Sequence, residues 1–507
     1  MRALLQHLLS LYQKIINYAD LERFKEQHLC QLFENWSGEP ATQICPLPPS
    51  GSYREYYRLS NREHQAIGVY NADRKENIAF LEFTRHFLKK GLAVPEVYAQ
   101  ELDQNVYLLE DLGDTTLFSH LSDRRINGVF PNELIPWYKK TLESLVELQV
   151  DAGKDLNYTH CYPRASFDKQ SMMWDLNYFK YYFLKLAKVP FDEQLLEDDF
   201  HTFCDYLLQA DCTHFLYRDF QARNIMLHND RPYFIDYQGG RKGALQYDLA
   251  SILYQAKANI PQEIRHELLE HYLNTLSDLM PIDQEAFIQH FYGYVLIRHM
   301  QVLGAYGFRG FFERKNHFLE SIPYALNNLS WILHHANLPV ETPILQGILT
   351  KLTQSEFLKK YAPKPVENSS LLVRVSSFSY KRGGIPKDPS SHGGGFVFDC
   401  RSIHNPGRYA PYKKLTGRDP EVIAFLKQKS NIDEFLTHVF SLVDSAVENY
   451  VTRNFDHLMV SFGCTGGQHR SVFCADALSK HLSNKYNIQV VLEHIEQEKK
   501  GWVNGEL

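Results

Sequence analysis

The stretch 217–224 contains residue types that phosphoryl transfer requires, at a spacing that brings them onto one loop. Asp219 is followed after four residues by Asn224, and Asp236 comes directly behind the apolar segment 233–235. The first aspartate and the asparagine supply a proton acceptor and a metal ligand, and the second aspartate can meet the same metal ion. Asp219 is therefore expected to orient or deprotonate an acceptor hydroxyl. Asn224 and Asp236 are expected to hold Mg²⁺ at the phosphates of ATP, because a few hard oxygen ligands suit that ion.

Each of these residues alone is more typical of a turn or a helix cap, but the ordered set favours an ATP- and Mg²⁺-dependent kinase. The arrangement resembles the aminoglycoside phosphotransferase family, which has a kinase-like fold. The resemblance covers about residues 40–340 and includes a hairpin at 51–59, a hinge at 109–114 and the segment 247–251. It is most similar to the branch that phosphorylates N-acetylmuramate and N-acetylglucosamine at the anomeric hydroxyl (AmgK-like kinases).

This resemblance also implies roles for residues outside the loop. They are three nucleotide contacts, Arg54, Arg58 and Glu110, and two supports of the catalytic loop, Arg218 and Asp248. The strand expected at 65–70 lacks the lysine with which protein kinases hold the nucleotide phosphates. Either Arg54 or Arg58 replaces that lysine, as the similar sugar kinases imply, or nucleotide binding is weak and the domain is an inactive kinase.

A second motif lies near the other end of the chain, at 461–471. It follows the apolar residues 458–460 and precedes a helical pattern, so it reads as a strand, a glycine-rich turn and a helix N-terminus. Such a turn presents backbone N–H groups to an anion. Gln468, His469 and Arg470 stand where a Walker motif would have Gly-Lys-Ser/Thr, which favours a phosphate bound without a metal. The alternative is a tight turn with a purely structural role.

The second motif, Gly-Cys-Thr-Gly-Gly-Gln-His-Arg-Ser, resembles the C-terminal domain of the RNase adapter RapZ over about residues 371–507. The resemblance implies a domain that senses glucosamine-6-phosphate and binds small RNA. The resemblance does not include the N-terminal P-loop domain of that family. In this sequence the kinase-like domain precedes the RapZ-like segment instead. The residues implied for the sugar-phosphate site are Thr465, Gly466, Gly467, His469 and Arg470, with Asp399, Arg401 and Asn405 nearby.

The chain of 507 residues, 44% of them hydrophobic, is longer than a single core usually organises. We expect an α+β kinase-like two-lobe domain followed by a smaller α/β domain. The long helical patterns at 133–150, 191–210 and 244–336 predict a mostly helical second lobe in the first domain. The expected boundaries are 1–362 for the kinase domain (small lobe about 40–112, helical lobe about 113–340), 363–370 for a linker, and 371–507 for the second domain.

Charge gives limited information about partners. From residue 371 onward the chain has 17 Lys or Arg and 14 Asp or Glu, a net charge of +3. Since the whole chain has a net charge of −6, residues 1–370 carry a net charge of −9. This asymmetry permits RNA as a partner of the second domain but is weaker than in most proteins dedicated to RNA.

Eight cysteines show neither a C-x-x-C pair nor a regular spacing, which favours reduced thiols in a cytoplasmic protein. Residues 1–10 read as an amphipathic helix without a signal-peptide pattern, and no stretch approaches the roughly 18 apolar residues of a membrane span. No membrane partner is therefore expected.

Together these patterns predict a cytoplasmic ATP- and Mg²⁺-dependent sugar kinase, acting on an amino sugar in cell-wall recycling. Its C-terminal module would bind a hexosamine phosphate as an effector. Two alternatives stay open. One is an inactive kinase-like protein that serves as a metabolite-sensing RNA-binding adapter. The other is an aminoglycoside kinase, for which an acidic acceptor pocket would be expected.

Overall fold

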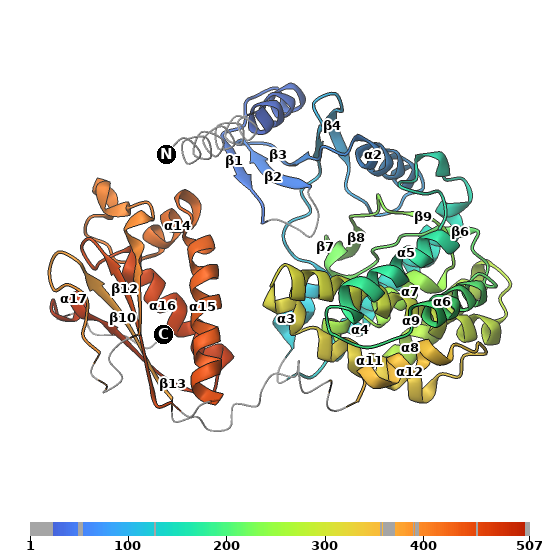
Figure 1. Ribbon diagram of the computed structural model, residues 1–507. Helices are drawn as coiled ribbons and strands as arrows, with labels where there is room; N and C mark the ends of the chain where they lie inside the picture. The colour runs from blue at the N-terminus through green and yellow to red at the C-terminus, as the bar shows by residue number, and fades with distance from the viewer. Residues whose placement is uncertain are drawn as a thin grey trace, which may run out of the picture. The chain divides into compact units, whose positions relative to one another are not determined.

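The computed structural model describes residues 24–48, 54–125, 128–354, 357, 371–388, 390, 395–452 and 455–501. The chain divides into two compact units, Met1–Ala362 and Pro363–Leu507 (Figure 1). The first unit combines an antiparallel sheet with many helices, and the second is built on a parallel sheet. The expected order of an α+β unit followed by an α/β unit is thus confirmed. The predicted helix at 1–10, the start of the hairpin at 51–53 and the linker at 363–370 lie outside the described residues.

The small lobe is a five-stranded antiparallel sheet in the order β1-β2-β3-β5-β4. Helix α2 begins after Asp73, whose carboxylate accepts the N–H groups of Lys75 and Glu76. Its buried face packs into the helical lobe as well, since Phe87 meets Phe215 edge-on, with ring centroids 5.4 Å apart. The two lobes therefore share one apolar core. The elements are β1 Gln43–Pro46, β2 Glu55–Ser60, β3 Gln65–Tyr70, α2 Arg74–Lys89, β4 Val97–Glu101 and β5 Val106–Leu109.

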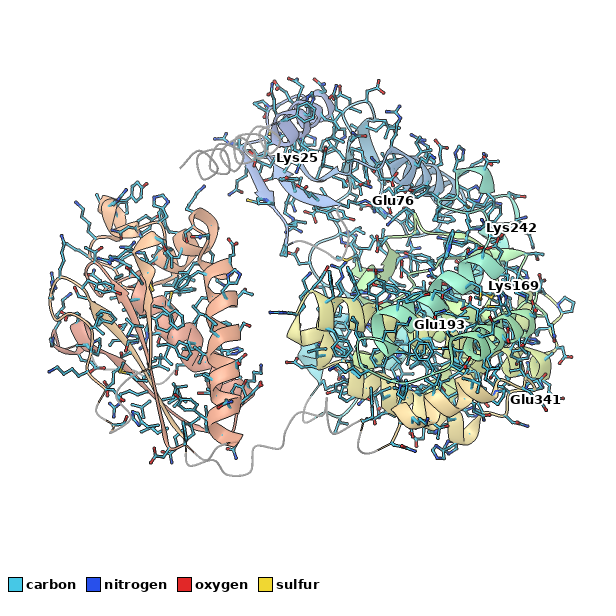
Figure 2. All side chains as sticks on the ribbon, in the orientation of Figure 1. Lys25, Glu76, Lys169, Glu193, Lys242 and Glu341 are labelled. Atoms are coloured by element: carbon cyan, nitrogen blue, oxygen red, sulfur yellow. The ribbon has the colours of Figure 1, made fainter. Side chains whose placement is uncertain are left out.

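A helix over residues 24–37 covers this sheet. Leu29 and Phe33 are fully buried against Leu59 and other strand residues. Lys25, labelled in Figure 2, donates to the carboxylate of Glu55 at 2.6 Å and so attaches the helix to β2.

The helical lobe is organised around α9, a 23-residue helix with little polar surface. It packs against α5, α7 and α11, because its side chains are buried over most of its length. The helices are α3 Leu117–Arg124, α4 Ile135–Val146, α5 Lys169–Phe179, α6 Glu193–Leu207, α7 Gln246–Leu253, α8 Gln262–Leu279, α9 Gln284–Tyr306, α10 Asn316–Leu319, α11 Ile322–His335 and α12 Pro343–Leu352.

Two short antiparallel pairs lie between the lobes and carry the loop with Asp219. Strand β6 (His214–Leu216) pairs with β9 (Arg241–Gly243), and β7 (Ile225–His228) pairs with β8 (Arg231–Phe234). The loop with Asp219 therefore starts at the end of β6 and leads into β7.

The second unit has a four-stranded parallel sheet in the order β11-β12-β10-β13. The two central strands are β12 and β10. The chain runs from β10 to the edge strand β11, and from β12 to the opposite edge strand β13, so the direction of the connections reverses between the two central strands. Ligands of open parallel sheets bind at such a switch point, outside the carboxyl ends of the strands. The elements are β10 Leu372–Ser379, β11 Gly395–Asp399, α14 Pro420–Lys429, α15 Ile432–Thr452, β12 His457–Cys464, α16 Arg470–Lys485, β13 Gln489–His494 and α17 Ile495–Glu498. The strand, turn and helix predicted around 461–471 are confirmed as β12 and α16.

Across the described parts of the chain, no helix is both long and apolar enough to cross a bilayer.

Close packing between two π-helical turns, Lys180–Leu184 and Gly307–Phe312, gives a test of the helical lobe. A Cβ at Gly307 would lie 1.9 Å from the carbonyl oxygen of Tyr182, whereas a Cβ at the exposed Gly347 of α12 would meet no atom within 4 Å. We expect Gly307→Ala to lower the free energy of unfolding by about 2 kcal/mol or more through overpacking. Gly347→Ala should raise it by about 0.5–1 kcal/mol, because alanine favours the helix. Urea denaturation of both variants measures this, and equal effects would contradict the described packing.

Candidate active site

The loop after β6 brings the three residues of the first motif together. Asn224 ends a single 3₁₀ turn, Ala222–Asn224, and its Nδ2 donates to the backbone oxygen of Asp219 at 2.9 Å. The same Nδ2 donates to Oδ2 of Asp236 at 3.3 Å. Asp219 stays accessible, with 46% of its side chain exposed. A group that is to receive a proton from a substrate needs that access.

Asp248, in the first turn of α7, holds the backbone of this loop. Its carboxylate accepts the N–H of Tyr217 at 2.7 Å and the N–H of Arg218 at 3.0 Å. Gln149 donates to it at 3.2 Å. Complete burial raises the pKa of Asp248 to about 7, although these hydrogen bonds oppose the rise. The residue has no exposed surface, so it acts on the loop and not on a substrate.

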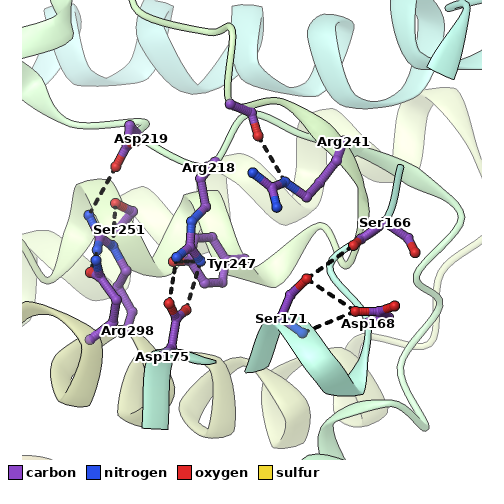
Figure 3. Close-up of polar contacts among 12 residues, drawn as sticks. Ser166, Asp168, Ser171, Asp175, Arg218, Asp219, Arg241, Tyr247, Ser251 and Arg298 are labelled. Carbon is purple, nitrogen blue, oxygen red and sulfur yellow. Dashed lines mark hydrogen bonds and ion pairs between the residues drawn. The ribbon is translucent and has the colours of Figure 1, made fainter. Parts of the chain in front are cut away.

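Arg218 anchors the loop from the other side of its backbone. Its guanidinium makes two hydrogen bonds to Asp175, at 2.8 and 2.6 Å, and donates to the hydroxyl of Tyr247 at 2.5 Å (Figure 3). It also lies 4.9 Å from the ring centroid of Phe167. Arg218 has a φ of +83°, a backbone conformation that residues other than glycine rarely adopt. Contacts on both its backbone and its side chain hold it there.

Asp236 is the residue best placed to bind a divalent cation. It follows β8, has a φ of +71°, and accepts a hydrogen bond from Gln238 at 2.7 Å. Burial and the neighbouring charge of Asp219 raise its pKa, whereas Gln238, Arg54 and Arg223 act in the opposite direction. Among the residues the structure describes, no three His, Cys, Asp or Glu side chains gather as a metal site. A Mg²⁺ ion held by Asp236 and Asn224 would thus take its remaining ligands from phosphates and water, as that ion usually does.

The two hairpin arginines lie in different surroundings. Arg54 is 3% exposed and forms ion pairs with Glu76 of α2 at 3.1 Å and with Asp236 at 3.7 Å (Glu76 is labelled in Figure 2). Asn71 also donates to Glu76, at 2.8 Å. Arg54 is therefore a buried cation beside Asp236, paired with a helix glutamate.

Arg58 faces the predicted hinge instead. It makes two hydrogen bonds to Asp111, at 2.5 and 3.0 Å, and two to Asp114, at 3.1 and 2.8 Å. Glu110, the other predicted nucleotide contact, accepts the N–H of Glu96 through its carboxylate at 3.2 Å. Arg58 therefore fixes the hinge, and Arg54 is the better candidate for replacing the missing lysine.

Arg298 of α9 is a site residue that the sequence did not assign. Its Nη2 lies 3.8 Å from Oδ1 of Asp219, and its Nε donates to the hydroxyl of Ser251 at 3.0 Å (Figure 3). The available signal was a lone arginine in an otherwise apolar helix, which has many structural explanations. Glu76, Asp175 and Tyr247 were missed as well, because their role depends on contacts between distant segments.

A small pocket of about 30 Å³, with room for about one water molecule, adjoins the loop beside Arg298. None of the described residues that line it is an aspartate or a glutamate. Its polar lining includes Gln221, Ser251, Tyr254, Gln255, Arg298 and His299. The pocket thus carries positive and neutral groups.

In the second unit, the loop between β12 and α16 lies at the carboxyl end of the sheet. Gly467 has a φ of +63°, and a Cβ there would lie 2.7 Å from Glu496. Thr465 accepts a hydrogen bond from Ser379 of β10 on its backbone oxygen, at 2.8 Å. A Cβ on Gly466 would meet no atom within 4 Å, so this part of the loop is open. The loop is held at the switch point between β10 and β12.

The remaining predicted residues of this site gather around the same loop, largely paired with one another. Arg470 is 4% exposed, and its guanidinium donates to the backbone oxygens of Arg401 and Ile403 at 3.0 and 2.7 Å. It also reaches Thr465 Oγ1 at 3.5 Å. Arg401 forms an ion pair with Asp399, at 2.6 Å. These contacts make Arg470 a support of the loop.

His469 and Asn405 lie on either side of Gly407. His469 contacts the backbone oxygen of Tyr412 through Nε2 at 2.8 Å, and Asn405 accepts the N–H of Gly407 at 3.1 Å. A Cβ on Gly407 would lie 3.2 Å from the His469 ring and 3.3 Å from Asn405 Oδ1. Burial lowers the pKa of His469, so the ring favours its neutral form.

Comparison with known proteins identifies both units. Residues 68–282 match the phosphotransferase enzyme family, so the first unit carries a kinase-like phosphotransferase domain. Residues 371–498 match the RapZ C-terminal domain. The chain therefore joins a phosphotransferase-family domain to a RapZ-like C-terminal domain, as the two resemblances predicted.

Among similar curated proteins is a nucleotide-binding protein of Methylococcus capsulatus, 33% identical over 172 residues, which cover 34% of this chain and 55% of that protein. Another, from Fervidobacterium nodosum, is 33% identical over 184 residues, which cover 36% of this chain and 60% of that protein. This chain thus spans little more than half the length of these relatives. A solved structure of Plasmodium vivax ethanolamine kinase matches with a TM-score of 0.42 and 13% identity, covering 57% of this chain and 82% of that one.

The raised pKa of Asp248 predicts a pH dependence of stability. Because its folded-state pKa is raised to about 7 from 3.8, the folded state holds a proton that the unfolded state releases. The contribution of protonated Asp248 to the free energy of unfolding is therefore present at low pH and is lost as the pH rises through about 7. The stability of the native protein relative to Asp248→Asn should therefore fall by about 1.4 kcal/mol per pH unit between roughly pH 5 and 7. Urea denaturation across this range measures it, and parallel curves for the two proteins would contradict the prediction.

Proposed function

We propose that the first unit transfers the γ-phosphate of ATP to a sugar hydroxyl in a Mg²⁺-dependent reaction. The observation that carries this proposal is the loop in which Asp219, Asn224 and Asp236 meet, with Arg54 beside them. The acceptor class we favour is an amino sugar, N-acetylglucosamine or N-acetylmuramate, phosphorylated at the anomeric position. Support comes from the phosphotransferase family match and from the resemblance of the hairpin and hinge to those sugar kinases.

In the proposed reaction each of these side chains has a role that its position supports. Asp219 takes the proton of the acceptor hydroxyl as the oxygen attacks, and Arg298 positions its carboxylate. Asn224 and Asp236 would hold the metal ion, which neutralises charge on the phosphates and aligns them for in-line transfer. Arg54 neutralises the negative charge that remains on the phosphates, and its ion pair with Glu76 holds it in place. Positioning and fixed charge together are what phosphoryl transfer needs.

For the second unit we propose binding of a hexosamine phosphate at the loop formed by residues 465–469. The RapZ-like family match and the position of the loop at the switch point of the sheet support this. The effector would adjust kinase output, which links both units to amino-sugar metabolism in cell-wall recycling. RNA is a weaker proposal: the RapZ-like resemblance implies it, but the net charge of +3 beyond residue 370 is low for a domain that binds RNA.

The alternative of an inactive kinase-like adapter is favoured by one observation, the absence of a lysine from β3. Against it stands Arg54, which supplies a buried cation next to Asp236 and is paired with Glu76. An adapter that has lost catalysis has no need of a buried cation paired in this way beside Asp236.

Phosphotransfer itself tests the proposal. We expect the full chain with ATP and Mg²⁺ to phosphorylate N-acetylglucosamine or N-acetylmuramate, and to leave kanamycin and choline unmodified. Asp219→Asn should lower kcat by about 10²–10⁴-fold, because the proton acceptor is lost. Asp205→Asn, which removes an exposed aspartate paired with Lys169, is the matched control and should retain full activity. Phosphorus NMR identifies the product, and transfer to kanamycin alone would overturn the acceptor class.

Effector binding is tested by titrating glucosamine-6-phosphate into the full chain in a calorimeter, with glucosamine as the control without phosphate. We expect saturable binding that Thr465→Val weakens by about tenfold, because a hydroxyl partner of the phosphate is lost. The KM or kcat for the sugar should shift as the effector saturates. Absence of heat together with unchanged kinetics would refute this part of the proposal.

A further inference from the structure

The glycine-rich loop of the second unit begins at a cysteine and ends at an arginine. Cys464 is the last residue of β12, and Arg470 is the first residue of α16, a helix of 16 residues. The loop between them is open at Gly466, where a Cβ would meet no atom within 4 Å. A helix N-terminus and the N–H groups of such a loop attract an anion. They also stabilise a thiolate, which is the reactive form of cysteine.

The surroundings of the Cys464 thiol favour its ionised form. Its Sγ lies 3.2 Å from the hydroxyl oxygen of Ser471, in the first turn of α16. Burial acts to raise the pKa of Cys464, but hydrogen bonds from the hydroxyl and N–H of Ser471 and from the N–H of Gln468, together with the charge of Arg470, lower it below its usual value. By contrast, burial raises the pKa of four other thiols, which belong to Cys30, Cys161, Cys204 and Cys212.

Arg470 brings a buried cation with an unused donor to the same loop. The residue is 4% exposed, and its Nη1 donates to the backbone oxygens of Arg401 and Ile403. Its Nη2 reaches Oγ1 of Thr465, the residue after Cys464, at 3.5 Å. Its Nε is buried without a hydrogen-bond partner among the described residues. A buried charged donor without a partner is costly, and an anionic oxygen at the loop would satisfy it. The loop thus combines a nucleophile with the fixed positive charge that phosphoryl transfer needs.

We propose that the second unit hydrolyses phosphate monoesters, with Cys464 as the nucleophile. This inference rests on the proposed binding of a phosphate at residues 465–469 and adds a reaction to that binding. The substrate class is a monoester with an accessible phosphate, such as a hexosamine phosphate, because the loop would hold the phosphate itself. Cys464 is 3% exposed, so electrophiles that the loop does not bind have little access to its sulfur.

The proposed reaction has two steps. In the first, the thiolate of Cys464 attacks phosphorus, an S–P bond forms and the P–O bond to the alcohol breaks. The leaving oxygen keeps the electron pair of that bond and takes up a proton, which balances the proton that the thiol gave to solvent. In the second step, water attacks phosphorus, the S–P bond breaks and its electron pair returns to Sγ. Inorganic phosphate leaves with the oxygen and the protons of that water. Ser471 stabilises the thiolate, and Arg470 stabilises the charge on the phosphoryl oxygens.

Three variants test this chemistry. Cys464→Ser removes the sulfur and nearly keeps the size of the side chain, whereas Ser471→Ala keeps the cysteine and removes the hydroxyl beside it. The matched control is Cys474→Ser, which changes another buried cysteine, one turn beyond Arg470 on α16. The full chain is incubated with glucosamine-6-phosphate or with para-nitrophenyl phosphate. ATP is omitted and EDTA is added, so that the kinase unit does not contribute.

We expect the native chain to release inorganic phosphate from both esters. Cys464→Ser should lower kcat by about a hundredfold or more, because the nucleophile is lost, and Ser471→Ala by about tenfold, because the thiolate loses a donor. Cys474→Ser should match the native kcat within about twofold, since it leaves the loop unchanged. After acid quenching, mass spectrometry should find one phosphoryl group on the Cys464 peptide of the native chain and none on that peptide of Cys464→Ser.

Calorimetry keeps this inference distinct from the effector proposal. A Cys464→Ser variant that binds glucosamine-6-phosphate as the native chain does, but no longer hydrolyses it, would support both. If neither protein binds glucosamine-6-phosphate, the effector proposal fails, and para-nitrophenyl phosphate alone decides the role of the thiol. If Cys464→Ser does not fold, the kcat of Ser471→Ala decides it. Full hydrolysis by a folded Cys464→Ser or Ser471→Ala variant would overturn the inference, as would a native chain that hydrolyses neither ester.

Discussion

The active centre depends on one buried carboxylate. Asp248 accepts the N–H groups of two successive loop residues, Tyr217 and Arg218, at a point where Arg218 adopts a positive φ. Such a conformation costs an ordinary residue about 1 kcal/mol or more, and the loop keeps it only because surrounding contacts demand it. Since Asp219 follows directly, its direction is set by a helix that never meets the substrate. Loss of this brace would free the backbone on which the proton acceptor stands.

A second constraint joins the metal-binding segment to the same loop. The hydroxyl of Tyr217 donates to the backbone oxygen of Ile235 at 2.5 Å, directly before Asp236. Arg54 then connects Asp236 to Glu76 on α2, whose apolar face packs into the helical lobe. One continuous set of contacts thus joins α2, Asp236 and the loop that carries Asp219. The positive charges of Arg54 and Arg298 stand on either side of two aspartates that have to approach a phosphate.

Much of this was predictable from the sequence where the signal is local. The spacing of Asp219, Asn224 and Asp236 predicted that they meet, and the apolar residues 458–460 predicted the strand before the glycine-rich loop. Charge pairing across the fold was not predictable. Arg54 and Arg58 occupy equivalent positions in the sequence pattern, and only the fold shows that one faces Asp236 and the other the hinge. Only the fold shows that Arg470 donates to two backbone carbonyls, because these belong to residues 67 and 69 positions earlier in the chain.

We propose that this centre binds a metal–nucleotide complex through Asp236. Electron paramagnetic resonance of Mn²⁺, a spectroscopic substitute for Mg²⁺, measures it directly in the presence of ATP. We expect saturable binding of Mn²⁺–ATP to the native chain and a loss of about tenfold or more in affinity for Asp236→Asn, since a charged ligand is removed. Equal affinity in the two proteins, or no binding to the native chain, would contradict it.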